Sequence, residues 1–296
     1  MTRRRSPPLT DSQLASPWAD LQAASGQGDQ VTPDAYRLAF ADPEFMLRPE
    51  TRGVRLQLEL LKPELAQSAL GVEHTIVVFG SARFLAPDVA RAQLAEAAAS
   101  GDAERLRVAE RDLRNSAYYE AAYRFGRLVA SHTKHCVHLA ERLFICTGGG
   151  PGVMEAANRG AFDEHMPTLG LNIELPHEQS ANPYVTPGLA FKFHYFAMRK
   201  MHFMMRARAL VAFPGGFGTL DEFFEVLTLV QCRKSERVPI VLYGSDYWHR
   251  LISFELLVEE GTISPEDMDL LTFVDNPDDA WRAICRFYEL TDAAAL

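Results

Sequence analysis

The stretch that most constrains the fold is LVAFPGGFGTLDEFFE, residues 210–225. Its apolar beginning predicts a short buried strand, its glycine-rich middle a turn, and its end an amphipathic helix that opens at Thr219 and runs to Gln231. Because Gly215, Gly216 and Gly218 have no Cβ, we expect the backbone there to reach positive φ and to approach a ligand closely. The first N–H groups and the positive dipole end of the helix face the same place. This unit therefore predicts a site for a phosphate or another anion.

Acidic side chains follow the glycine turn within the first part of this helix. Asp221, Glu222 and Glu225 place carboxylates within reach of anything held at the turn. Phosphate binding alone has no use for that negative charge. We therefore expect a site that does more than hold an anion.

Apolar, β-branched runs alternate with helical patterns along most of the chain. This alternation predicts an α/β fold with a Rossmann-like, doubly wound, mostly parallel sheet and right-handed crossovers. A long, proline-rich stretch, residues 174–188, has the features of an active-site loop. The strands are expected at residues 75–79, 143–147, 168–173, 210–213, 238–243 and 271–274, and the helices at 88–114 and 116–131 with a break near Asn115, then at 153–164, 195–208, 248–260 and 277–290.

The first part of the chain differs from the rest in composition. Residues 1–33 are rich in Pro, Ser, Gln, Gly and Asp, and we expect them to form a disordered arm. Two helical patterns follow, at residues 34–40 and 50–70, and Pro63 is expected to kink or split the second. The sequence thus predicts an N-terminal helical extension over residues 34–70 and one main domain over residues 71–296.

Charge and hydropathy exclude several classes of protein. The net charge is −9 and the pI is about 5.5, so we expect no affinity for nucleic acid or anionic membrane, which requires clustered positive charge. No window approaches the length of a membrane span, and no apolar region follows the N-terminal arginines. The four cysteines contain no Cys-x-x-Cys pair and are expected to be reduced. These features predict a cytoplasmic protein.

A second glycine turn, residues 147–152, also lies between a predicted strand and a predicted helix. It fails the dinucleotide pattern Gly-x-Gly-x-x-Gly, because that pattern started at Gly148 requires glycine where the chain has Val153. A mononucleotide or phosphate site and a purely structural turn both stay open. Glu155, in the first turn of the next helix, is either a ligand of that site or a partner of the helix dipole. Neither glycine turn is followed by the Lys and Ser/Thr of a Walker loop.

Two adjacent cations, Arg199 and Lys200, lie on the predicted helix before residues 210–213. They are either surface charges or a cation delivered to the crevice that holds Glu222. The histidines at 132, 135 and 138 are spaced at three residues, but they indicate a solvated helix end better than a metal site. No Gly-x-Ser-x-Gly turn is present for a serine nucleophile. We expect neither a metal nor a cofactor.

Four motifs in order resemble the LOG ("Lonely Guy") family. Residues 214–222 match its PGGxGTxxE signature, and residues 147–158 its companion glycine motif. The pair Arg199-Lys200 precedes Pro214 as the family's Arg-Lys pair precedes its own loop, and residues 80–83 resemble the end of its first strand. Asp221 stands where many members have Glu, and the residues before Arg199 differ from those of the short plant-like members. With its N-terminal extension, the chain resembles the longer bacterial subgroup.

The resemblance implies a usually dimeric phosphoribohydrolase that cleaves the N-glycosidic bond of nucleoside 5′-monophosphates, either AMP or N6-substituted cytokinin-type adenylates. Such proteins were formerly described as lysine decarboxylases. This sequence shows no pattern of a pyridoxal site, so it does not support that description. The alternative from another class is a nucleotide- or cofactor-binding carrier without catalysis. A homodimer or a higher homo-oligomer is expected. Carried onto this sequence, the resemblance makes Arg199 and Glu222 catalytic and assigns substrate binding to Ser81, Gly149, Gly150, Glu155, Lys200, Gly215, Gly216, Gly218 and Thr219.

Overall fold

The computed structural model describes residues 38–174 and 180–290. It divides into two compact units, residues 1–58 and residues 59–296. The described part of the first unit holds short helical segments, η2 (Ala39–Ala41), α2 (Pro43–Met46) and η3 (Pro49–Thr51), and the beginning of α3 (Arg52–Ala69). Asp42 caps α2, because its Oδ1 accepts the N–H groups of Glu44 and Phe45 at 3.0 and 3.1 Å. The expected arm, residues 1–33, and most of the expected helix 34–40 lie outside the described residues.

The second unit is built on a sheet of seven parallel strands in the order β4-β3-β2-β1-β5-β6-β7. This topology confirms the expected α/β, Rossmann-like, doubly wound sheet. The order reverses between β1 and β5, and such a switch point opens a crevice at the carboxyl ends of the strands. The strands are β1 (His74–Phe79), β2 (Leu143–Thr147), β3 (Leu169–Ile173), β4 (Ala190–Phe193), β5 (Ala207–Ala212), β6 (Ile240–Tyr243) and β7 (Leu271–Val274).

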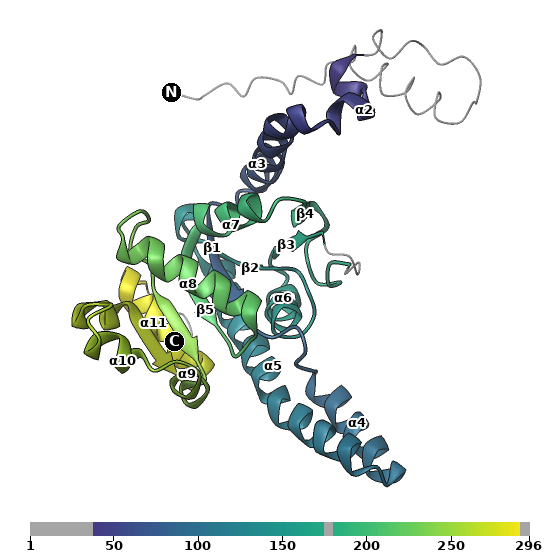
Figure 1. Ribbon diagram of the computed structural model, residues 1–296, viewed down its shortest axis with the longest axis vertical. Coiled ribbons are helices and arrows are strands. Elements are labelled where there is room, and N and C mark those ends of the chain that lie inside the picture. Colours follow the sequence, from purple (N-terminus) through teal and green to yellow (C-terminus); the bar gives the residue numbers. More distant parts are fainter. Residues whose placement is uncertain (1–37, 175–179, 291–296) are drawn as a thin grey trace. The chain divides into compact units, whose positions relative to one another are not determined.

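Helices cover both faces of this sheet (Figure 1). Successive side chains of a strand point to opposite faces, so Ile76 and Val78 join one core and Val77 and Phe79 join the other. The first core packs against α5 (Ala103–His135), α6 (Val153–Asp163) and α11 (Pro277–Tyr288). The second core packs against α7 (Phe196–Met205), α8 (Phe217–Gln231), α9 (Ser245–Leu251) and α10 (Phe254–Glu259). The remaining elements are α4 (Pro87–Ser100), η4 (Leu139–Glu141), η5 (Pro187–Leu189) and η6 (Pro265–Leu270).

Several expected boundaries were wrong. The break near Asn115 is absent, because α5 runs through that residue and the chain turns instead at Gly101, whose φ is 69°. Asp102 then caps α5 by accepting the N–H groups of Glu104 and Arg105. The helix expected at 248–260 is two helices, α9 and α10. Pro63 lies inside α3 and does not split it.

Strand β4 was not expected, although it extends the sheet beyond β3. Its four residues alternate, with Phe191 and Phe193 buried and Ala190 and Lys192 exposed. This pattern is too short to be distinguished from the loop and helix on either side of it.

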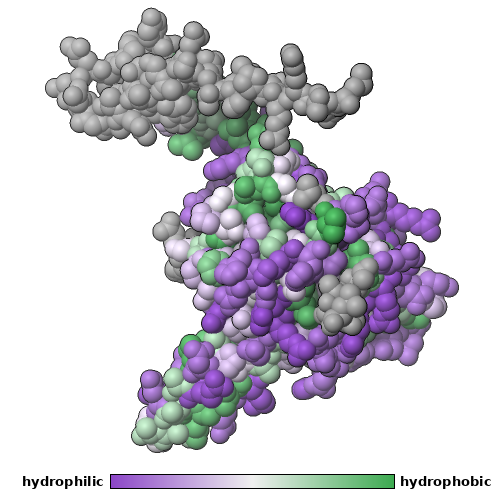
Figure 2. Space-filling view, turned by 180° about the vertical axis from the view of Figure 1, so that it is seen from behind, coloured by the Kyte–Doolittle hydropathy of each residue, from purple (hydrophilic) through white to green (hydrophobic). Residues whose placement is uncertain are grey.

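The surface of the second unit is mostly hydrophilic in the view of Figure 2, with apolar residues interspersed over the α4–α5 pair. No helix in the described part of the chain is long and apolar enough to span a bilayer. The large buried side chains belong instead to the two cores beside the sheet.

Candidate active site

Three strand ends meet where the strand order reverses. The N–H of Phe213 donates to the carbonyl of Phe79 at 2.8 Å, and the N–H of Ser81 donates to the carbonyl of Pro214 at 2.9 Å. The loop after β2 joins them, because the N–H of Val153 donates to the carbonyl of Ser81 at 3.1 Å. The loops after β1, β2 and β5 are thus tied by backbone hydrogen bonds at the switch point.

A cleft of about 620 Å³ opens at this junction. It takes in the ends of β1 and β2, the start of α6, the turn into α8, Arg199 of α7 and two residues of α9. Seven of the residues assigned from the sequence line it, namely Ser81, Arg199, Gly215, Gly216, Gly218, Thr219 and Glu222. The structure therefore brings both proposed catalytic residues and residues 215–219 of the glycine turn before α8 into one space.

Helix α8 begins at Phe217, two residues before the expected start. Gly215, Gly216 and Gly218 are not among the glycines with positive φ, so the expectation of left-handed backbone there was wrong. What matters at Gly215 is space, since a Cβ would lie 2.2 Å from Thr219 Oγ1 and 3.1 Å from the backbone carbon of Gly80. A Cβ at Gly216 or Gly218 would meet no atom within 4 Å. These two glycines leave the N-terminus of α8 open to the cleft, where its first N–H groups favour an anion.

Arg199 and Glu222 form an ion pair at the wall of the cleft. Arg199 Nη2 donates to Glu222 Oε1 at 3.2 Å, and the two side chains are only 14% and 4% exposed. The guanidinium lies against the rings of Phe196 and Phe203 on its own helix, at 5.2 and 5.6 Å from their centroids. Phe203 in turn packs edge-on against Phe79 of β1. Aromatic contacts therefore hold the cation in one place.

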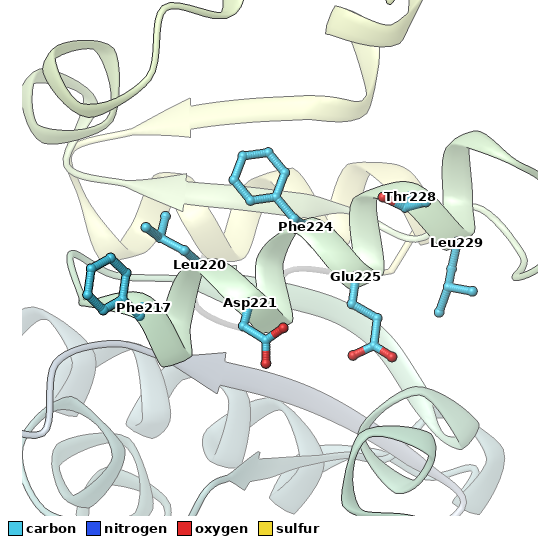
Figure 3. Close-up of a pocket in the computed structure, with 7 residues that line it drawn as sticks. All are labelled: Phe217, Leu220, Asp221, Phe224, Glu225, Thr228 and Leu229. Atoms are coloured by element: carbon cyan, nitrogen blue, oxygen red, sulfur yellow. The ribbon is translucent and has the colours of Figure 1, made fainter. Parts of the chain in front are cut away.

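Lys200 points to the other carboxylates of α8. Its Nζ lies 2.7 Å from Glu225 Oε2, 2.9 Å from Asp221 Oδ2 and 3.9 Å from Glu222 Oε2. Figure 3 shows Asp221 and Glu225 projecting to the same side of α8. Lys200 is absent from the lining of the cleft described above. It thus joins α7 to α8, while its neighbour Arg199 faces the cleft.

The Glu222 carboxyl is held in an unusual electrostatic state. Burial raises its pKa from 4.5 to about 7, although Arg199 and Lys200 act to lower it. The same burial lowers the pKa of Arg199, which nonetheless stays protonated at neutral pH. A carboxyl whose pKa lies near neutral pH is suited to accepting and returning protons.

The glycine turn of residues 147–152 lies against a buried polar network. Gly149 has a φ of 71°, its N–H donates to Thr147 Oγ1, and its carbonyl accepts the N–H of Asn182 at 2.8 Å. Asn182 Nδ2 donates to the carbonyl of Gly150 at 3.0 Å and to Asn158 Oδ1 at 2.9 Å. Gly149 and Gly150 are buried, and the cleft lining described above includes Gly148 of this turn. In this structure both glycines shape the turn that supports the cleft.

Glu155 lies outside that lining as well. Its Oε1 accepts a hydrogen bond from the buried hydroxyl of Tyr119 at 3.0 Å. Of the two possibilities left open by the sequence, this contact favours a role within the fold.

Residues that the sequence did not suggest also line the cleft. Tyr247 of α9 donates its hydroxyl to the carbonyl of Gly215 at 2.6 Å, and Leu251 lies one turn further along the same helix. Met154 and Arg83 also line it, and no ion pair of Arg83 is seen among the described residues. Tyr247 follows the glycine turn by 32 residues, so only the fold brings the two together. Arg83 was quoted as part of a motif, without a role.

The comparisons with known proteins agree with the motifs. A family model described as "Possible lysine decarboxylase" matches residues 154–284. Cytokinin riboside 5′-monophosphate phosphoribohydrolase LOG3 of Arabidopsis thaliana is 27% identical over 161 residues, 53% of this chain and 70% of that protein. LOG1 of the same plant is 28% identical over 151 residues, 50% of this chain and 66% of that protein. The resemblance to the LOG family is confirmed.

A further relative matches a similar share of the chain at similar identity. The probable LOG4 enzyme of Oryza sativa subsp. japonica is 29% identical over 151 residues, and the match covers 50% of this chain and 62% of that protein. The chain thus spans about two thirds of the length of these LOG relatives. Among solved structures, the Moco carrier protein of Chlamydomonas reinhardtii aligns with 74% of this chain and 99% of that one, at 18% identity and a TM-score of 0.43. A structural-genomics target covers 72% of this chain and 99% of that one, at 18% identity and a TM-score of 0.44.

Proposed function

We propose that this protein hydrolyses the N-glycosidic bond of nucleoside 5′-monophosphates, AMP or N6-substituted cytokinin-type adenylates, to the free base and ribose 5-phosphate. The observation that carries the proposal is the buried Arg199–Glu222 pair in one cleft with the open N-terminus of α8. A carboxylate and an anion site side by side suit a sugar phosphate whose reacting carbon lies a few bonds from its phosphate. The named activity of the LOG relatives supports the same reaction class.

The phosphate end of the cleft accounts for the proposed requirement for a monophosphate. The N–H groups at the start of α8 lie beside the Thr219 and Ser81 hydroxyls, and Arg83 adds a positive charge to the same lining. Donors of this kind bind a phosphate dianion through charge-assisted hydrogen bonds. Binding energy from the phosphate then orients the ribose at Glu222.

The reaction requires only water as co-substrate. The bond from C1′ to the base nitrogen breaks with its electron pair going to the base, the base takes up a proton from solvent, and the oxygen of water bonds to C1′. The proton that Glu222 removes from that water returns to solvent, which regenerates the carboxylate. Positive charge develops on the ribose in an oxocarbenium-like transition state, which the Glu222 carboxylate stabilises while it accepts the proton of the attacking water. Arg199, which donates to Glu222 Oε1, orients that carboxylate and favours its ionised form.

The pH dependence of kcat/KM is expected to follow Glu222. Burial raises the pKa of this carboxyl to about 7, so the acid form prevails below that pH and the active carboxylate above it. The rate constant should rise with pH and reach half of its plateau near pH 7. The phosphate of the substrate also titrates, near pH 6. The pH profile of the residual activity of Glu222→Gln shows the contribution of the phosphate alone. A rate that falls as the pH rises through 7 contradicts this role for Glu222.

Tyr247→Phe is expected to weaken nucleotide binding. Removal of the hydroxyl leaves the Gly215 carbonyl without the partner it has at 2.6 Å, at a cost of about 1–3 kcal/mol, and loosens the turn that positions the phosphate. KM for AMP should rise by about tenfold, with a smaller change in kcat. The matched control is Tyr243→Phe, since the Tyr243 hydroxyl donates to the carbonyl of Asp275 and Tyr243 is not in the cleft lining given above. Equal KM values for the two variants would contradict the role of Tyr247.

The proposal is tested by incubating the protein with AMP, N6-isopentenyl-AMP, other nucleoside monophosphates and free adenosine, with base and ribose 5-phosphate followed by chromatography. Release from monophosphates but not from adenosine supports the proposed activity, and the relative rates give the base preference. Tight nucleotide binding with no release from any of them favours the carrier alternative.

We also propose that the protein is cytoplasmic and acts as a homodimer or a higher homo-oligomer, as the family resemblance implies. Sedimentation at the protein concentration of the activity assay tests the oligomeric state. A fully active monomer contradicts it.

A further inference from the structure

Helix α7, which carries Arg199, is attached to α3 at both of its ends. The attachment involves residues 59–72, to which the sequence motifs assign no function. Because Arg199 reaches Glu222 from α7, whatever fixes the position of α7 also fixes the ion pair.

The N-terminal end of α7 is capped by Glu59. Its Oε1 accepts the N–H of His194 at 2.9 Å, and its Oε2 accepts the N–H of Tyr195, the N-cap residue, at 3.1 Å. Both carboxylate oxygens are thus used on backbone groups at the positive end of a helix, a charge-assisted arrangement. The Glu59 carbonyl also lies 3.2 Å from Nε2 of the buried His202.

The C-terminal end of α7 is held through Arg206. Its Nη2 donates to Glu64 Oε1 at 2.5 Å and to Ser68 Oγ at 2.9 Å, and its Nη1 donates to the carbonyl of Val72 at 2.6 Å. The side chain of Arg206 is only 9% exposed. A helix anchored at both ends in this way cannot shift along its axis without losing several of these bonds.

We propose that Glu59 is a positioning residue for the active site: by capping α7 it holds Arg199 in register with Glu222. This inference rests on the proposed function. By this inference the second half of α3 contributes to catalysis, although none of its residues belongs to the cleft lining described above. A small shift of α7 is enough to matter, since displacement of a reacting group by about 1 Å costs up to about 100-fold in rate.

The test compares Glu59→Ala and Glu59→Gln with the wild type and with Lys62→Ala. Lys62 is exposed on the same helix and shows no ion pair or hydrogen bond in the described part of the chain. We expect Glu59→Ala to lower kcat for AMP by about tenfold with KM within about threefold of the wild type. Glu59→Gln keeps one acceptor oxygen and should fall between the two. Lys62→Ala should leave both constants unchanged.

A second readout separates positioning from a general loss of stability. Glu222 is faced by Arg199 and Lys200 of α7 and by Asp221 and Glu225 of its own helix. If α7 withdraws, the two cations withdraw and the two acids stay, so the midpoint of the pH profile should move upward in Glu59→Ala. Hydrogen–deuterium exchange of the peptide over residues 194–200 should rise in the same variant.

The outcomes are distinct. A folded Glu59→Ala protein with the kcat, pH midpoint and exchange of the wild type overturns the inference. A fall in kcat with unchanged midpoint and exchange overturns it as well, because the effect then does not pass through α7. If the wild type releases no base, the proposed function fails. The exchange and the ¹³C-detected titration of Glu222, assigned with Glu222→Gln, still decide whether Glu59 positions Arg199.

Discussion

Glu222→Gln is expected to lower kcat for AMP by about 10²–10⁴-fold while nucleotide binding is retained. The amide has nearly the shape of the carboxyl, so the cleft and its neighbours stay in place. It cannot accept the proton of water, and it brings no negative charge to the ribose as the bond to the base breaks. Because the loss falls on the transition state, kcat should fall far more than KM changes. Steady-state rates and equilibrium titration with AMP measure the two effects separately.

Glu225→Gln is the matched control on the same helix. Glu225 lies one turn after Glu222, bonds to Lys200 at 2.7 Å and is not in the lining of the cleft with Arg199. Its replacement removes the same charge from the same helix and should change kcat by less than about tenfold. Comparable losses in the two variants would indicate a field effect of the whole acidic cluster and would contradict a special role for Glu222.

Arg199→Ala is expected to lower kcat by about 10²–10³-fold, the range found when a preorganised charged or hydrogen-bonding group is removed from an active site. Without the guanidinium, the carboxyl of Glu222 loses its donor at 3.2 Å and the cation that opposes the effect of burial on its pKa. The pKa of Glu222 should therefore rise further, and the pH at half-maximal kcat/KM should move upward with it. The rate and the pH profile check both parts.

Lys200→Ala separates the two adjacent cations. Lys200 is bound by Asp221 and Glu225, so its loss should lower thermal stability and change kcat much less than Arg199→Ala does. The sequence motif presents the two residues as one pair, whereas the structure gives them different neighbours. A larger kcat loss in Lys200→Ala than in Arg199→Ala would reverse this division.

The sequence predicted the centre of the site because the information there is local. A strand that ends in Pro214 and glycines, followed by a helix with Glu222 in its second turn, gives the carboxylate and the anion site together. Arg199 lies on α7, the helix directly before β5. Because the sheet is parallel, the start of this helix lies at the same edge of the sheet as the end of β5. The parallel sheet itself followed from the alternation of strands and helices.

What the sequence did not predict depends on tertiary contacts. Asn115 lies inside the continuous helix α5, and residues of that helix on either side of it, Ala109 and Tyr119, are buried. The roles of Gly149 and Gly150 depend on Asn182. Tyr247 and Glu59 act through backbone groups 32 and 135 residues away. Such contacts produce no recognisable periodicity or motif spacing in the sequence, because each joins two segments that are far apart along the chain and meet only in the folded protein.

The measurement that tests the central claim most directly is a single-turnover incubation of AMP with a molar excess of the protein, quenched in acid and analysed for all products. We predict that AMP is replaced by adenine and ribose 5-phosphate in equal amounts, and that Glu222→Gln binds AMP and returns it intact. Recovery of intact AMP from the wild type, despite demonstrated binding, would contradict the hydrolase. Adenosine and phosphate as products would contradict cleavage at the ribose–base bond.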